Sequence, residues 1–320
     1  MLTRRRFCAI AATTTLAVAT PSLWPRFAWS QESPGLTLKE LRDGAWAVLG
    51  MGGNGLLLRT DEGPVLVDCK VFDAAEALYD VVSAKAGAPS LIINTHHHGD
   101  HVGGNWIFRM KHADVSVIAH RNSLPRTAET LDQEALPSLA AMAENPETTD
   151  RAAELRSTLT AAHFQADRVY DDRLTLNHGD IMLELSHDGP GHTDNDTVVF
   201  IPQLNLLHVG DLVFHRLNGF VDMSGGCDPL RWPEVLRGLD RLGDAETIVV
   251  PGHGDVCDKT ALPAMADYFD QMREIVEHAL AEGRTIDEIA EMKPAVFENL
   301  GFPSILPRAI RGMAEALAGS

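Results

Sequence analysis

Short apolar runs separated by glycine recur along this chain, and their length is typical of strands rather than helices. Residues 45–49, 55–59 and 64–68 form three such runs close together, and we predict a strand for each. The same pattern returns further along the chain. It predicts strands over residues 90–95, 115–119, 181–186, 198–201, 205–209 and 247–250.

Segments of helical pattern fill the intervals between these runs. The longest, residues 123–162, is rich in Ala, Glu and Leu and predicts two helices that break near Asn145. From about residue 259 onward the chain is again mostly helical in pattern. Shorter helices are predicted over residues 73–86, 103–111 and 233–242. Because strands followed by a helix occur twice, we predict an α/β protein of two packed sheets with helices outside.

The first thirty residues have a different character. Three arginines begin at Arg4, an apolar stretch follows, and no acidic residue occurs before Glu32. This order is typical of a secretory signal, and the apolar stretch is too short to remain as a membrane anchor after cleavage. The arginines followed by Phe7 resemble a twin-arginine signal. We therefore predict a signal peptide over residues 1–30, the twin-arginine (Tat) translocation machinery as a partner, and a periplasmic or secreted protein; a cytosolic protein with a basic N-terminus is the alternative.

Composition and charge narrow the choice of partners. The chain has 320 residues, 45% of them hydrophobic, which is ample for a globular core. Its formal net charge is -18, and nucleic acid or an anionic membrane surface would require clustered cations instead. The charge suits a protein that acts on small molecules. Three cysteines lie beyond the predicted signal, namely Cys69, Cys227 and Cys257. This odd number leaves at least one free thiol or an intermolecular bond, and a single disulfide is possible.

The densest cluster of candidate metal ligands follows the strand predicted to end at Thr95, where the sequence reads His-His-His-Gly-Asp-His. Alternate residues leaving a strand end project to one side, so His96 and His98 form a chelating pair. Asp100 and His101 follow a glycine that bends the chain, and they turn toward a second ion. Imidazole and carboxylate ligands suit zinc. A solvated histidine-rich loop is the alternative interpretation.

Three further candidate ligands stand beside glycine at predicted strand ends. His192 lies in Gly-Pro-Gly-His-Thr, Asp211 follows Gly210, and His253 lies in Pro-Gly-His-Gly. Each alone is more often a turn histidine or a capping aspartate. Together with the first cluster they provide seven ligand groups for two metal ions. His97 lies on the other alternation, so we expect it to support the ligands or to face solvent.

These residues resemble the motifs of the metallo-β-lactamase superfamily, which occur here in order over most of residues 31–320. Asp68, which ends Leu-Val-Asp, resembles the first motif and would support the metal loop. The resemblance implies an αββα sandwich, with two mixed sheets flanked by helices and a helical extension from about residue 259. It also implies one ion held by His96, His98 and His192, another held by Asp100, His101 and His253, and a bridging Asp211.

The resemblance further implies a dinuclear zinc hydrolase. Two divalent ions that share a water molecule make hydroxide available near neutral pH, and this bridging hydroxide would attack a carbonyl group. Asp100 and Asp211 would be the catalytic carboxylates that orient the ions. We expect two Zn²⁺ per chain, with iron or manganese as alternatives, and an ester, thioester, lactone or β-lactam as the substrate. The alternatives are a mononuclear iron enzyme similar to persulfide dioxygenases and an exported metal-binding protein without turnover.

Overall fold

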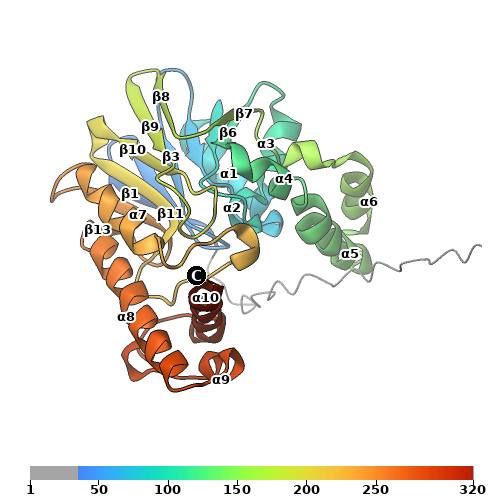
Figure 1. Ribbon diagram of the computed structural model, residues 1–320. Coiled ribbons are helices and arrows are strands. Elements are labelled where there is room, and N and C mark those ends of the chain that lie inside the picture. Colours follow the sequence, from blue (N-terminus) through green and yellow to red (C-terminus); the bar gives the residue numbers. More distant parts are fainter. Residues whose placement is uncertain (1–34, 320) are drawn as a thin grey trace, which may run out of the picture.

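Alternation of apolar side chains along the strands separates the interior into distinct cores. The computed structural model describes residues 35–319. In β3 (Gly55–Leu58), Leu56 and Leu58 pack between two sheets, whereas Leu57 packs against helices on the other face. Each sheet is therefore covered on both faces, and the layers follow the order helices, sheet, sheet, helices (Figure 1).

The first half of the described chain forms a seven-stranded sheet. The strands β1 to β4 pair antiparallel, and β4 to β7 pair parallel. The carboxyl ends of β4, β5 and β6 therefore lie on the same side of the sheet. In sheet order the strands are β1 (Thr37–Arg42), β2 (Ala45–Leu49), β3, β4 (Val65–Val67), β5 (Leu91–Ile93), β6 (Ser116–His120) and β7 (Arg168–Tyr170).

The second half forms a six-stranded sheet. Its strands β11 and β12 pair parallel, and every residue of β11 is buried, as expected for a parallel strand covered on both faces. The other pairs are antiparallel. In sheet order the strands are β13 (Cys257–Asp258), β12 (Ile248–His253), β11 (Leu206–Phe214), β10 (Val198–Ile201), β9 (Ile181–Ser186) and β8 (Arg173–His178).

Helices cover the outer face of each sheet. Those of the first half are α1 (Ala75–Ala86), α2 (Gly99–Val102), α3 (Asn105–Lys111), α4 (Leu124–Thr127), α5 (Leu136–Glu144) and α6 (Thr149–Thr158). Those of the second half are α7 (Trp232–Gly238), α8 (Ala261–Ala281), α9 (Ile286–Ala290) and α10 (Leu306–Gly319). Figure 1 shows α5 and α6 on the opposite side of the molecule from α7 and α8. None of the helices described is long and apolar enough to cross a membrane.

The structure confirms the predicted sandwich and its main elements, but the sequence missed four strands. These are β1, β7, β8 and β13, and each is the outermost strand of a sheet. An outermost strand has one unpaired side and carries exposed polar residues, so it lacks the apolar run that marks a central strand. The predicted signal peptide over residues 1–30 lies outside the described residues.

Two helical predictions also need correction. The segment 123–162 breaks after Glu144 as expected, yet it also contains α4 and a π-helical turn at Leu131–Ala135. The helix predicted over residues 103–111 starts earlier, as α2, and continues as α3. Among the described residues Cys69, Cys227 and Cys257 are all free thiols.

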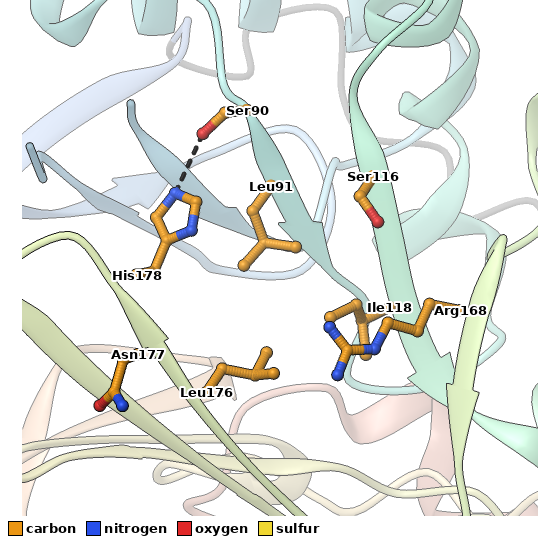
Figure 2. A pocket seen from close by; sticks show the side chains of 8 residues that line it. All are labelled: Ser90, Leu91, Ser116, Ile118, Arg168, Leu176, Asn177 and His178. Atoms are coloured by element: carbon orange, nitrogen blue, oxygen red, sulfur yellow. Dashed lines mark hydrogen bonds between the residues drawn. The ribbon is translucent and has the colours of Figure 1, made fainter. Parts of the chain in front are cut away.

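A cavity of about 180 Å³ lies at the amino ends of β5, β6 and β7, beside β8 (Figure 2). Leu91, Ile118 and Leu176 line it together with polar residues, among which Ser90 Oγ lies 3.0 Å from Nε2 of His178. The cavity forms where the outermost strands β7 and β8 diverge into different sheets. It is therefore on the opposite side from the carboxyl ends of the parallel strands, which carry the candidate ligands.

We expect Phe269→Ala to destabilise the helical layer over the six-stranded sheet. Phe269 is fully buried, and its ring centroid lies 4.2 Å from that of Trp232. Loss of a buried Phe side chain costs about 3–5 kcal/mol of unfolding free energy, which urea denaturation would measure. Val296→Ala is the control, because this side chain is 53% exposed and its loss should change the unfolding free energy by less than about 0.5 kcal/mol. Equal effects of the two substitutions would contradict the layer assignment.

Candidate metal centre

The candidate ligands meet at one end of the sandwich. The strand β5 leads into the histidine-rich segment and α2, and a turn separates β9 from β10. The parallel strands β11 and β12 run further than the sequence predicts, so Asp211 lies inside β11 and His253 is the last residue of β12. All seven predicted ligands lie in this region: His96, His98, Asp100, His101, His192, Asp211 and His253.

These side chains form two neighbouring groups. The first, which we call the three-histidine group, comprises His96, His98, His192 and Asp211. The second, which we call the acidic group, comprises Asp100, His101 and His253. Within each group, one ligand atom per residue lies within 4.8 Å of the others. The histidines and Asp100 divide in space as the sequence resemblance implies, and Asp211 is grouped with the three histidines.

Asp211 faces both groups. Its Oδ2 lies 3.4 Å from Nε2 of His192 and 3.4 Å from Nε2 of His253, while its Oδ1 lies 3.1 Å from Nε2 of His101. The approach depends on Gly252, because a Cβ atom there would lie 1.9 Å from Oδ1 of Asp211. A single buried carboxylate therefore lies between the histidines of two candidate ion sites.

Hydrogen bonds at the far side of the rings fix where two histidines carry their protons. Nδ1 of His192 lies 2.9 Å from the carbonyl oxygen of Phe220, which can only accept, so Nδ1 carries the hydrogen. Nε2 of His98 lies 3.0 Å from Oδ2 of Asp222 and donates in the same way. The remaining nitrogens, Nε2 of His192 and Nδ1 of His98, then present lone pairs 2.9 Å apart. Two lone pairs at this distance repel each other, and a bound cation would remove that cost.

Asp68 fixes His96 through a relay. The hydroxyl of Thr95 donates to Oδ2 of Asp68 at 2.7 Å, so its oxygen is left to accept from Nδ1 of His96 at 3.0 Å. Nε2 of His96 therefore presents a lone pair as well, and it lies 3.0 Å from Nδ1 of His98. Three imidazole lone pairs thus converge beside Asp211, a ligand set suited to zinc.

Asp68 also fixes His101 in the acidic group. Nδ1 of His101 lies 2.7 Å from Oδ2 of Asp68 and donates to it. Among the described residues, Nε2 of His101 and Oδ1 of Asp211 are buried and lack a hydrogen-bond partner, although they lie 3.1 Å apart. Burial lowers the pKa of His101, but Asp211, Asp100 and Asp68 outweigh it and raise this pKa well above its ordinary value, so the space between the two atoms suits either a proton or a metal ion. The residues therefore fit a second ion.

Electrostatics differ between the groups. Burial, reinforced by His98, lowers the pKa of His192 to about 3 against the attraction of Asp211, so this ring stays neutral. Burial also lowers the pKa of His96 well below its ordinary value. In the acidic group burial is outweighed by Asp211 and Asp100, which raise the pKa of His253 to about 9. A proton can thus compete for the acidic group but not for the three-histidine group.

Three further polar residues near the candidate ligands are also buried. His97 is buried rather than facing solvent, and its Nδ1 lies 3.0 Å from Nδ2 of Asn195. His208 is a fully buried core histidine whose Nε2 lies 3.1 Å from the carbonyl oxygen of Asn54. The sequence did not single out Asp222. No local motif marks it, because its partner His98 lies 124 positions away.

Comparison with known proteins finds similar sequences and one matching family model. The family model described as the metallo-beta-lactamase superfamily matches residues 49–253. The metallo-beta-lactamase type 2 of Bacillus cereus is 27% identical over 244 residues, which cover 72% of this chain and 81% of that protein. The beta-lactamase-like protein 2 homolog of Caenorhabditis elegans is 24% identical over 265 residues, covering 79% and 72%.

Solved structures share the fold. A metallo-beta-lactamase from Pontibacter korlensis matches with a TM-score of 0.53 and 22% identity over 73% of this chain and 99% of that one. The DIM-1 metallo-beta-lactamase matches with a TM-score of 0.55 and 19% identity over 75% and 99%. The helices α8, α9 and α10 all lie beyond residue 253, where the family model ends.

We expect Asp68→Asn to weaken both candidate ion sites. An amide nitrogen in place of Oδ2 would donate toward Thr95 and His101, which would shift the protons of both His101 and His96 onto the nitrogens that face the ions. Loss of such supporting hydrogen bonds typically costs 10- to 100-fold in metal affinity. Zinc titration against a competing chelator measures this.

The control for this variant is Asp240→Asn, which removes the same charge at a carboxylate that is 85% exposed and pairs only at the surface with Lys259. Its zinc affinity should stay within about twofold of the unmodified protein, since such surface pairs contribute little. Wild-type zinc affinity in Asp68→Asn would show that the relay does not position the ligands.

Proposed function

The chain belongs to the metallo-beta-lactamase superfamily, and from that premise we propose that it is an exported, zinc-dependent hydrolase with two ions per chain. The observation that supports this most is the convergence of imidazole lone pairs on the two sides of Asp211. Such a set is costly to bury without cations. The family and the His/Asp groups make it a metal-binding hydrolase of this fold; zinc, the ion count and export are our proposals.

The ligands would be divided as the two groups are. His96, His98 and His192 would hold one ion, Asp100, His101 and His253 the other, and Asp211 would contact both. Two divalent ions bound there would lower the pKa of a water molecule toward neutrality and polarise the carbonyl group of a substrate.

The protein's own contribution is to hold this set rigid. Asp68 is fully buried and orients two rings, while Phe220 and Asp222 orient two more. Asp100 is the most exposed carboxylate of the set, with 28% of its side chain accessible, so the acidic group lies nearer the solvent. Substrate would therefore approach from the side of Asp100.

The bond class we propose is an ester, thioester, lactone or β-lactam. These share a carbonyl carbon that hydroxide attacks and a leaving group whose charge a second ion stabilises. The similarity to proteins named metallo-beta-lactamase type 2 supports including β-lactams. Asp211 stands where, by the family resemblance, the B1 subclass carries cysteine, which supports including thioesters and lactones.

Metal content and hydrolysis test the proposal together. We expect about two zinc ions per chain by elemental analysis. Hydrolysis of at least one of a chromogenic cephalosporin, a thioester and a lactone should be lost on chelation and restored by zinc. One iron per chain, with oxygen uptake on a persulfide and no hydrolysis, would replace this proposal with the iron-enzyme alternative.

Substitution of Asp211 sharpens this test. In Asp211→Ala we expect hydrolysis to fall by at least about 100-fold and the ion content to drop below two, because both groups lose a shared ligand. Asp240→Asn is again the matched surface control. An Asp211→Ala protein with two ions and full activity would remove Asp211 from the centre.

We also propose export through the twin-arginine machinery. The support is the order of arginines, apolar stretch and small residues in residues 1–30. Replacement of Arg4 and Arg5 by Lys should retain the full-length precursor in the cytoplasm, as measured by cell fractionation. Normal export of this double variant would contradict the proposed route.

A further inference from the structure

The loop that follows β11 supplies acceptors to two rings of the three-histidine group. The carbonyl oxygen of Phe220 accepts from His192, and Oδ2 of Asp222 accepts from His98. We call residues 220–222 the acceptor loop. Because these bonds decide which nitrogens face the ion, a shift of the loop would disturb two ligands at once.

Arg308, in the first turn of α10, contacts every residue of the acceptor loop. Its Nε donates to the carbonyl oxygen of Val221 at 3.1 Å, and its Nη2 donates to Oδ1 of Asp222 at 3.3 Å. Its guanidinium carbon lies 4.5 Å from the ring centroid of Phe220. A planar guanidinium can make these three contacts together, whereas the single ammonium of lysine cannot.

The helix α10 is seated closely on the same loop. Its buried face repeats at helical spacing, from Leu306 through Ile310 to Met313. Gly312 lies on that face, and a Cβ atom there would lie 2.4 Å from Cγ1 of Val221. The absence of a side chain at Gly312 therefore lets the helix backbone approach the loop.

The segment before α10 reaches the acidic group. Phe302 lies with its ring centroid 5.8 Å from that of His253. It adopts φ of 55°, a left-handed conformation that costs a non-glycine residue about 1 kcal/mol or more and that surrounding contacts must maintain. The carbonyl oxygen of Gly301 accepts from the backbone N–H and side-chain amide of Asn218, each at 2.9 Å. This anchors the segment to the loop that follows β11.

We propose that Arg308 is a positioning residue for the metal centre: it holds the acceptor loop so that His98 and His192 present their lone pairs to the ion of the three-histidine group. Arg308 lies 55 positions beyond residue 253, where the family model ends, so the support comes from a part of the chain that the family model does not cover. The proposal deepens the proposed function and rests on it only in requiring that these histidines bind a divalent ion.

Arg308→Met tests this role because methionine keeps an apolar stem but removes both donors and the charge. We expect the affinity of the three-histidine group for Co²⁺ or Zn²⁺ to fall about 10-fold in competition titrations, while the acidic group changes less than about threefold. Arg308→Lys should recover only part of the loss. Nitrogen NMR of the histidine rings should show that His98 and His192 lose their single tautomers in Arg308→Met.

Arg311→Met is the matched control. Arg311 is on the same helix and pairs with Asp287, a carboxylate that is 86% exposed. Its removal should leave metal affinity and ring tautomers unchanged. Both variants should unfold at similar denaturant concentrations when metal-free. If Arg308→Met unfolds at a much lower denaturant concentration than Arg311→Met, its loss of metal affinity does not separate positioning from folding. The ring tautomers of Arg308→Lys are then the deciding measurement.

Wild-type tautomers and affinity in either Arg308 variant would overturn the proposal. Failure of the proposed function would look different. The wild-type protein would then hydrolyse none of the substrates or retain no zinc, whereas Co²⁺ titration and ring tautomers would still report on Arg308.

Discussion

The position of the protons on four buried histidines is the constraint on which the site depends. Each of these rings donates from its far nitrogen to an oxygen held by the fold, namely Oγ1 of Thr95, Oδ2 of Asp222, Oδ2 of Asp68 and the carbonyl oxygen of Phe220. Neutral imidazole has one donor and one acceptor. Fixing the donor outward therefore leaves the other nitrogen of each ring facing the two candidate ion sites around Asp211.

The sandwich meets this constraint because it places the oxygens that accept from the histidine rings at the ends of neighbouring strands. Asp68 directly follows β4 and Thr95 lies two residues beyond β5, and these strands pair in parallel. Their carboxyl ends are adjacent, so one buried carboxylate reaches the Thr95 hydroxyl, the Thr95 amide and His101. Glycine completes the packing: at Gly53 a Cβ atom would lie 2.1 Å from the His101 ring.

A feature of the fold or the site could be predicted from the sequence only where a short local pattern marks it. The candidate ligands are detectable because each stands in a short motif after an apolar strand, as His253 does in Pro-Gly-His-Gly. Central strands are detectable because both faces are apolar. The outermost strands are not, since β8 alternates exposed and half-buried residues without a buried one. Asp222 and Arg308 carry no motif: they meet 86 positions apart only after two layers have packed.

Because α10 packs closely on the acceptor loop, docking of the helix and binding of an ion affect each other. If docking of the helix raises the affinity of the three-histidine group for an ion, then the bound ion must stabilise docking of the helix by the same factor. A tenfold coupling corresponds to about 1.4 kcal/mol. Among the helices beyond residue 253, α10 is where this linkage should be strongest, because Gly312 and Arg308 both contact the loop that orients the ligands. The helical extension would then respond to the occupancy of the metal centre rather than serve only as a cover for the sheet.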